Sequence, residues 1–172
     1  MNGLFACLAG SRGPVPHIPR SVAGLWLVLL LSACATLTGE PSAVGAARGI
    51  TIVPLADGNT RIDIATDTAF DFGSDVLRPA FSVQLAQTVK PYLQHAVRVS
   101  CYTDNVGAPA FNLDLSQRRA GAVAALLREQ GFSTTQLAVS GYGEDDPVAS
   151  NASETGRRQN RRIELLITAK VP

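Results

Sequence analysis

A strand and a long helix, joined by a loop, follow one another over residues 97–130, and this succession limits the folds open to the chain. Residues 97–102 (VRVSCY) alternate apolar with polar side chains, which predicts a half-buried strand. Apolar residues then recur at helical spacing from about Asn112 or Ser116, and Gly131 marks the end of the helix. A strand that leads into a helix indicates a fold in which helices pack on a sheet.

The loop and the helix carry charges of opposite sign. Asp104 lies in the loop, after Thr103, and Arg119 lies in the first turns of the predicted helix. An acid and a base in these positions can face each other across a cleft, and such a pair suits a ligand with both an ammonium and a carboxylate. The alternative is an ordinary surface ion pair, which contributes about 0–1 kcal/mol. The two residues by themselves leave both interpretations open.

The other predicted elements alternate in the same way. Ile50, Ile52, Ile62 and Ile64 alternate with polar residues around an Asp-Gly-Asn turn, which predicts a β-hairpin, and Pro54 places its first strand at a sheet edge. The further predicted elements, in chain order, are a strand at 68–72, a helix that starts near Pro79 and has His95 at its end, a strand at 137–140, a short helix at 153–159 and a strand at 163–169. Together these elements predict an α+β sandwich with helices packed on one sheet face, preceded by the amino-terminal hairpin.

The amino-terminal region has the pattern of a secretory signal. Residues 21–33 form an apolar run that is too short to span a bilayer, which takes roughly 20 residues, but has the length of a signal's hydrophobic core. A buried core helix is the weaker alternative, because bases precede the run and a polar linker follows it. The run ends in Leu-Ser-Ala-Cys34, which resembles the bacterial lipobox and implies cleavage before Cys34 and acylation of that cysteine. The predicted parts are a signal peptide at 1–33, a flexible tether at 34–48 and a folded domain at 49–172.

Composition and motif content argue against several classes of function. With 15 basic and 14 acidic residues in 172 the formal charge is +1, whereas a nucleic-acid-binding surface needs a clear basic excess. Cys7, Cys34 and Cys101 cannot form a complete disulfide set, and their spacing fits no metal site. No Ser-His-Asp or Cys-His arrangement is visible in the sequence. We therefore expect no enzyme, no metal, no cofactor and no nucleic-acid partner.

Four motifs occur in the order found in one known family. They are FDFGSDVLRP at 70–79, TDNVG and then NLDLSQRRAGAVAALL within 103–127, GYGEDDPVASN at 141–151 and GRRQNRRIEL at 156–165. This ordered set, over roughly residues 65–168, resembles the OmpA-like peptidoglycan-binding domain. With the lipobox, the whole chain resembles the peptidoglycan-associated lipoproteins. The resemblance implies a βαβαβ sandwich with a mixed sheet.

The resemblance also implies a ligand and the residues that bind it. The family holds the meso-diaminopimelate of the peptidoglycan stem peptide, and by position Asp104 would take its ammonium and Arg119 its carboxylate. The implied function is non-covalent tethering of the outer membrane to the cell wall by a lipoprotein that faces the periplasm of a Gram-negative bacterium. An alternative is an envelope protein whose domain mainly binds a protein partner in a trans-envelope complex. Further positions that match the family's cleft are Asn112, Leu115, Phe70, Asp71 and, in a supporting role, Arg161.

The chain departs from the family pattern at Cys101 and Tyr102, where Gly-His is usual. We expect Tyr102 to keep an aromatic wall beside the cleft and Cys101 to be a small buried residue. The early turns of the following helix are expected to add positive potential where the ligand carboxylate lies. Two interpretations are open for Arg157, Arg158, Arg161 and Arg162, a small anion-binding patch or a solvated helix end and strand entry, and for the first two we expect the solvated end. We expect the acids at 144–146 to face water.

Overall fold

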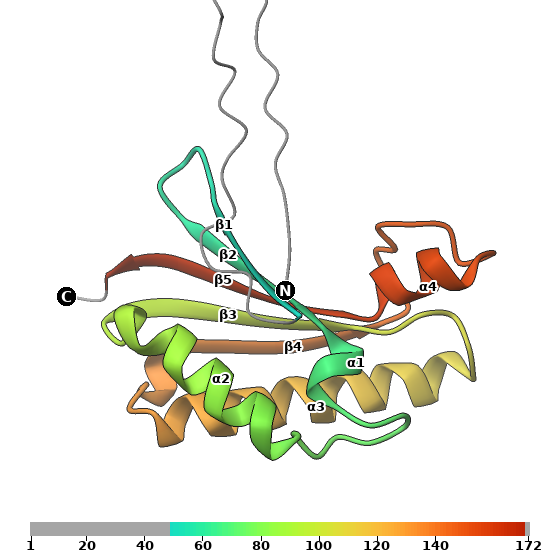
Figure 1. Cartoon of the computed structure of the whole chain (residues 1–172), viewed down its shortest axis with the longest axis horizontal. Coiled ribbons are helices and arrows are strands. Elements are labelled where there is room, and N and C mark those ends of the chain that lie inside the picture. The colour runs from blue at the N-terminus through green and yellow to red at the C-terminus, as the bar shows by residue number, and fades with distance from the viewer. Residues whose placement is uncertain (1–48, 171–172) are drawn as a thin grey trace, which may run out of the picture. The chain divides into compact units, whose positions relative to one another are not determined.

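The computed structural model describes residues 49–170, which form a five-stranded sheet with helices on one side (Figure 1). The predicted signal peptide at 1–33, Cys34 and the tether that ends at residue 48 lie outside the described residues. Within residues 49–170, no helix combines the length and the apolar character that crossing a membrane requires.

The sheet is mixed, as predicted, and its strands are β1 (Ile50–Pro54), β2 (Thr60–Ala65), β3 (His95–Tyr102), β4 (Leu137–Gly143) and β5 (Arg162–Lys170). They lie in the order β1-β2-β5-β3-β4, with β3 and β4 parallel and the other neighbours antiparallel. The hairpin prediction is confirmed, because Ile50 pairs with Ile64 and Pro54 with Thr60. Pro54 lies in an edge strand, where the missing N–H of proline is tolerated.

The longer helices, α2 (Pro79–Val89) and α3 (Pro109–Glu129), lie on the same side of the sheet (Figure 1). Each begins with a proline, which suits the first helical position because the N–H there has no intrahelical partner. This is the predicted α+β sandwich. Its shorter helical elements are α1 (Thr66–Ala69), α4 (Glu154–Asn160) and the 3-10 turns η1 (Lys90–Tyr92) and η2 (Thr134–Gln136).

The core lies between the sheet and the two longer helices. Strand pairing aligns Ile50, Ile64, Ile163 and Cys101 in one row across the sheet, and each is at most 1% exposed. Burying an aliphatic side chain contributes about 1.5–3 kcal/mol, so rows of this kind are what hold the sheet to the helices. The helix residues buried against them include Phe81, Leu85 and Val89 of α2 and Val123 and Leu127 of α3.

Gly141 in β4 allows α3 to lie close against the sheet. A Cβ at this position would come within 2.2 Å of the backbone nitrogen of Gln117 and 2.5 Å of the Ser116 hydroxyl. The N–H of Gly141 donates to Gln117 Oε1 at 2.8 Å, and the N–H of Gly143 donates to Ser116 Oγ at 2.8 Å. These contacts fix α3 along β4, and with it the position of Arg119.

Residues 68–72 do not form the predicted strand. Thr66–Ala69 form the single turn of α1, and Phe70 makes only an isolated bridge. Thr68, Phe70 and Phe72 in this stretch favour a strand by local propensity. The N–H of Thr66, however, donates to the carbonyl of Arg161 at 3.0 Å, so a residue far along the chain supports the turn that replaces the strand.

Three element boundaries also differ from the predictions. Helix α3 begins at Pro109, nearly a turn before Asn112, because this proline starts the helix rather than a turn. His95 is the first residue of β3 and not the end of a helix, since η1 separates it from α2. Strand β4 continues beyond Ser140 to Gly143.

Candidate ligand-binding cleft

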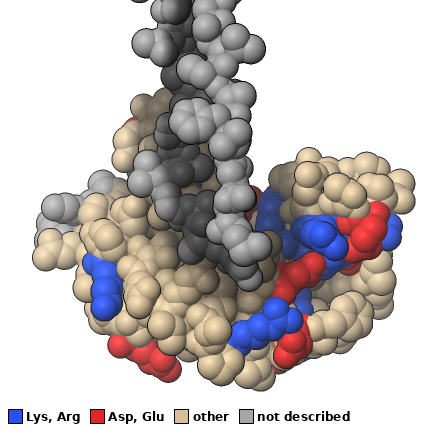
Figure 2. Space-filling view, in the orientation of Figure 1, with Lys and Arg blue, Asp and Glu red and all other residues tan. Residues whose placement is uncertain are grey.

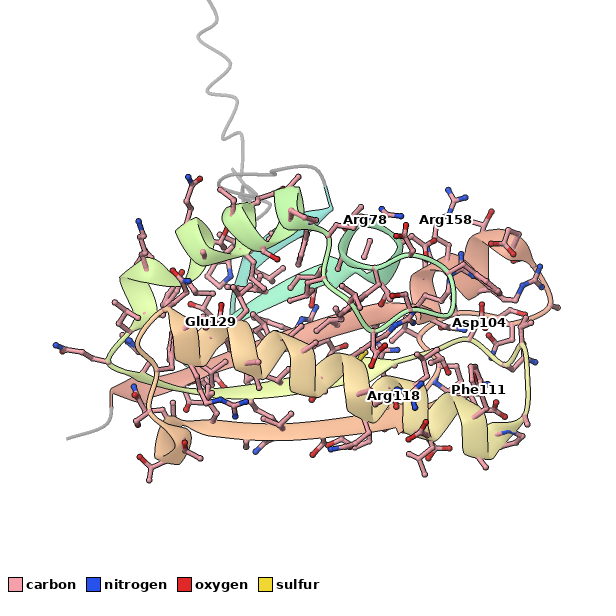
Figure 3. All side chains as sticks on the ribbon, turned by 90° about the horizontal axis from the view of Figure 1, so that it is seen from below. Arg78, Asp104, Phe111, Arg118, Glu129 and Arg158 are labelled. Carbon is pink, nitrogen blue, oxygen red and sulfur yellow. The ribbon has the colours of Figure 1, made fainter. Side chains whose placement is uncertain are left out.

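A cleft of about 530 Å³ opens where α1, the loop after β3, the first turns of α3 and the end of α4 meet. In Figure 3, Asp104 lies between the start of α3, marked by Phe111, and the side of the domain that carries α4. The fold brings together all of the residues predicted to bind the ligand, because the cleft is lined by Phe70, Asp71, Asp104, Asn112, Leu115, Arg119 and Arg161.

Asp104 forms the acidic end of the cleft and is 8% exposed. Its Oδ1 accepts the backbone N–H of Val106 at 3.0 Å, and its Oδ2 accepts Nη1 of Arg161 at 2.7 Å. Nδ2 of Asn112 donates to the Asp104 carbonyl at 3.3 Å and to Glu144 Oε2 at 2.9 Å. The loop is thereby held against α3, and the carboxylate has a fixed orientation.

Arg119 forms the basic end and is 5% exposed. Its Nε donates to the carbonyl of Ser74 at 2.8 Å and its Nη2 to the carbonyl of Asp71 at 3.3 Å, while Cζ lies 5.2 Å from the centre of the Phe70 ring. Among residues 49–170 its Nη1 has no hydrogen-bond partner and the guanidinium forms no ion pair. Burial lowers the pKa of Arg119, but arginine stays protonated at neutral pH. Buried charges are normally paired, so an unpaired one is unusual.

The start of α3 does not supply positive potential at Arg119. Because the helix begins at Pro109, Arg119 lies about 15 Å further along the helix axis. The influence of a helix terminus fades within its first turn. The expectation that early helix turns assist carboxylate binding is therefore wrong for the region around Arg119, where the guanidinium itself carries the positive charge.

Phe70 and Leu115 form apolar walls and are 2% and 5% exposed. Asp71 lies at the exposed rim, where its carboxylate accepts Nε and Nη2 of Arg78 at 3.1 and 2.7 Å. Its carbonyl, by contrast, accepts Nη2 of Arg119. Asp71 thus contributes to the buried part of the cleft through its backbone, and its side chain belongs to a surface ion pair.

Arg161 contacts three carboxylates. Its Nε and Nη2 donate to the two oxygens of Asp67 at 2.9 Å each, Nη2 also donates to Glu154 at 2.9 Å, and Nη1 donates to Asp104. The hydrogen bonds from Arg161 hold the pKa of Asp67 below its usual value, and those from Asp67 raise the pKa of Arg161. Sequence reasoning missed Asp67 and the contact between Arg161 and Glu154. Glu154 and Arg157 also form an ion pair, 2.8 Å long, at the i, i+3 spacing of neighbours on a helix, a signal that the sequence contained.

The cleft is electrically neutral overall. Figure 2 shows acidic and basic side chains side by side at the end of the domain where α4 lies. Arg158, next to them, is exposed and does not line this cleft, as expected for a solvated helix end. A neutral cleft with a separate buried acid and buried base suits a zwitterion better than a simple anion or cation. The charged residues that line it are Asp67, Asp71, Asp104 and Glu154, and Arg78, Arg119, Arg157 and Arg161.

Tyr102 does not form the expected aromatic wall. Its ring stacks on Tyr142 with centroids 5.0 Å apart and lies 3.7 Å below the guanidinium of Arg162, on the sheet face opposite the core. Cys101 is fully buried, as predicted, and burial raises its pKa to about 12. The departures at these two positions therefore affect the sheet and leave the charges of the cleft in place.

Three exposed apolar side chains lie at the mouth of the cleft, beside the charged side chains of its rim. Phe72, Val106 and Phe111 line it and are 100%, 57% and 50% exposed. Exposed apolar side chains that gather around a cleft favour contact with a ligand or partner that extends beyond the buried charges.

Comparison with known proteins identifies the fold. Residues 69–161, more than half of the chain, match the OmpA family. The chain belongs to the OmpA family. The resemblance seen in the sequence motifs is thereby confirmed, and the mixed sheet with helices on one side is the OmpA-like fold.

Two of the relatives and one solved structure are lipoproteins by name. The outer-membrane lipoprotein YfiB of Pseudomonas aeruginosa is 33% identical over 153 residues, which cover 84% of this chain and 89% of YfiB. The probable lipoprotein YiaD of Escherichia coli is 35% identical over 70% of this chain, and the chain spans about half of that relative, 56%. The solved peptidoglycan-associated lipoprotein of Burkholderia pseudomallei has a TM-score of 0.51 at 32% identity, covering 59% of this chain and 88% of that one. None of these names describes an enzyme, in agreement with the expectation of a binding domain.

Proposed function

We propose that the domain binds peptidoglycan non-covalently by holding the diaminopimelate of the stem peptide in the cleft. The observation that carries this proposal is the buried guanidinium of Arg119, which has no acidic partner among residues 49–170. A buried charge is costly when it is unpaired. A ligand carboxylate would supply the missing partner and would suit the planar fork of the guanidinium.

Asp104 supports the proposal from the other end of the cleft. Each of its oxygens accepts one hydrogen bond from the protein, so further lone pairs can accept an ammonium. The free end of diaminopimelate carries an ammonium and a carboxylate on one carbon, followed by an apolar carbon chain. Phe70 and Leu115 offer apolar walls for such a chain. The name of the relative from Burkholderia pseudomallei links this type of domain to peptidoglycan.

The proposed place of action is the periplasmic side of the outer membrane. The lipobox resemblance at Cys34 supports lipid anchoring, and YfiB is named as an outer-membrane lipoprotein. A tether over residues 34–48 would keep the domain within reach of the cell wall. Fractionation of cell envelopes tests this part: wild type should sediment with outer membranes, and Cys34→Ser should be lost from them. A Cys34→Ser protein that stays in the outer-membrane fraction would contradict lipid anchoring.

The test of wall binding is cosedimentation of the full-length protein, purified in detergent, with insoluble peptidoglycan sacculi. We expect Asp104→Asn and Arg119→Met to lose binding to diaminopimelate-type sacculi by about thirtyfold or more, since truncating one partner of a buried charge pair costs about 2–5 kcal/mol. Arg118→Met is the matched control, because Arg118 adjoins Arg119 but its side chain is 41% exposed and does not line the cleft.

Two outcomes of this experiment are decisive. Wild-type retention of both Asp104→Asn and Arg119→Met would overturn the assignment of the cleft. Equal binding of the wild-type protein to lysine-type sacculi, whose stem peptide lacks the second carboxylate, would contradict diaminopimelate as the recognised group. Circular dichroism of each variant checks that it is folded.

The exposed apolar side chains of the cleft favour a second candidate, an envelope protein whose domain mainly binds a protein partner. Phe72, which is fully exposed, lines the cleft together with Val106 and Phe111, and a protein could cover these side chains. A detergent-stable complex that survives Asp104→Asn and Arg119→Met but not Phe72→Ser would support this candidate. A complex that is lost with the two charge variants would count against it.

A further inference from the structure

The Arg161 guanidinium is shared unequally among the acids at one end of the cleft. Asp67 accepts two hydrogen bonds from it in a side-on fork, whereas Asp104 accepts one, from Nη1. Glu154 accepts one more through Nη2. A guanidinium binds a carboxylate most strongly in the fork geometry, so Asp67 is the principal partner of Arg161 and Asp104 a secondary one.

The backbone holds Asp67 and Arg161 side by side although they are 94 residues apart. Ala65, at the end of β2, pairs with Arg162, at the start of β5, and the N–H of Thr66 donates to the Arg161 carbonyl at 3.0 Å. Asp67 lies two residues after the end of β2, and Arg161 directly precedes β5. The pairing of these two strand ends therefore brings both residues together. The side chains of Arg161 and Asp104 are 18% and 11% exposed, so the contact between them lies away from bulk water.

Without Asp67, the fork of Arg161 would be free to turn to the next acid. Asp104 is within reach, since Nη1 already lies 2.7 Å from its Oδ2. A fork from Arg161 would occupy both oxygens of Asp104 and compensate its charge. An ammonium ligand would then have to displace a bidentate ion pair rather than join a carboxylate that retains accepting capacity.

We propose that Asp67 is a positioning residue of the cleft, which holds the fork of Arg161 and so leaves the Asp104 carboxylate open to the ligand ammonium. The inference rests on the proposed function, because it assumes that Asp104 receives an ammonium. It also makes the predicted supporting role of Arg161 specific, because Arg161 then acts through Asp104. The lowered pKa of Asp67, caused first by its hydrogen bonds to Arg161, agrees with an ionised carboxylate in this role.

The experiment measures binding of a soluble diaminopimelate-containing muropeptide to the full-length protein in detergent, by isothermal titration calorimetry. We expect Asp67→Asn to weaken binding about tenfold, the equivalent of roughly one lost charge-assisted hydrogen bond. Asp67→Glu should restore part of the affinity, because it can still form the fork. Asp75→Asn is the matched control, since Asp75 is also a half-exposed acid paired with an arginine, Arg118, but lies outside the cleft.

A double-mutant cycle distinguishes positioning from direct contact. If Asp67 acts through Arg161, Asp67→Asn should cause no further loss in an Arg161→Gln background. Equal losses in both backgrounds would mean that Asp67 meets the ligand itself, and would overturn the inference. A crystal structure of ligand-free Asp67→Asn tests the inference without a binding measurement. We expect Arg161 to donate two hydrogen bonds to Asp104 in this structure. An unchanged single hydrogen bond would refute the positioning role of Asp67.

Asp104→Asn in the same series separates this inference from the proposed function. If Asp104→Asn binds the muropeptide as wild type does, the proposed function itself fails. If Asp104→Asn loses binding while Asp67→Asn does not, only the role of Asp67 fails.

Discussion

The two ends of the cleft hold their charges by different means. The guanidinium of Arg119 is bonded to two backbone carbonyls and lies against the ring of Phe70. The carboxylate of Asp104 belongs to a network in which Arg161 also binds Asp67 and Glu154. Neutral groups alone position the base, whereas a charged group, Arg161, takes part in positioning the acid.

This difference predicts different behaviour at the two ends. Neutral carbonyls orient a charge without compensating it, so Arg119 keeps its full charge for an anion and does not titrate near neutral pH. The charge available at Asp104 depends on how Arg161 is distributed among three acids, and Arg161 lowers the pKa values of two of them, Asp67 and Glu154. Substitutions at the basic end should therefore alter the local structure. Substitutions at the acidic end should alter how the unfolding free energy depends on pH.

The largest effect is expected from Arg119→Met. The carbonyls of Asp71 and Ser74 would lose the charged donor of two part-buried hydrogen bonds, which costs about 1–3 kcal/mol of unfolding free energy. Chemical denaturation measures this loss, and hydrogen exchange should show faster exchange in the loop over residues 71–75. Asp104→Asn, which touches neither carbonyl, should leave exchange in that loop unchanged. Equal protection of the loop in Arg119→Met and wild type would show that the basic end does not depend on these bonds.

A smaller effect is expected from acid. Because Arg161 holds the pKa of Asp67 below its usual value, the Asp67 contribution to stability is present above that usual value and is lost as pH falls through the lowered one. Between about pH 5 and pH 2, wild type should therefore lose more unfolding free energy than Asp67→Asn. Urea titrations at several pH values measure the unfolding free energy of both proteins as a function of pH. If this free energy falls equally in both proteins as the pH is lowered, the acidic network does not stabilise the fold.

The basic end was easier to predict from sequence than the acidic end. Arg119 and the apolar wall residue Leu115 lie one turn apart on a single helix, so helical spacing and the family motif locate them together. Asp67 and Arg161 are in contact only because β2 pairs with β5. A local sequence pattern cannot predict a contact between residues that are 94 positions apart. Strand pairing, which periodicity does not specify, decides which charges become neighbours.

The mistaken strand at 68–72 has the same cause. Thr68, Phe70 and Phe72 favour extended backbone, and a single helical turn such as α1 is unfavourable in isolation. The bond between the Thr66 N–H and the Arg161 carbonyl supports that turn from another part of the chain. By contrast, the hairpin at 50–65 and the buried stripe of α3 follow from local turn chemistry and periodicity, and both predictions are confirmed.

The smallest effect is expected from Arg118→Ala, and its value lies in the comparison with the adjacent Arg119. Arg118 pairs with Asp114 one turn away and with Asp75 at 3.2 Å, and all three side chains are more than a third exposed. Exposed ion pairs of this kind contribute about 0–1 kcal/mol, so unfolding free energy should change by less than about 1 kcal/mol and retention on sacculi should match wild type. The two arginines have the same charge and differ in burial and partners. If Arg118→Ala lost wall binding as Arg119→Met is expected to, the general positive charge of α3 would explain recognition better than the buried guanidinium does.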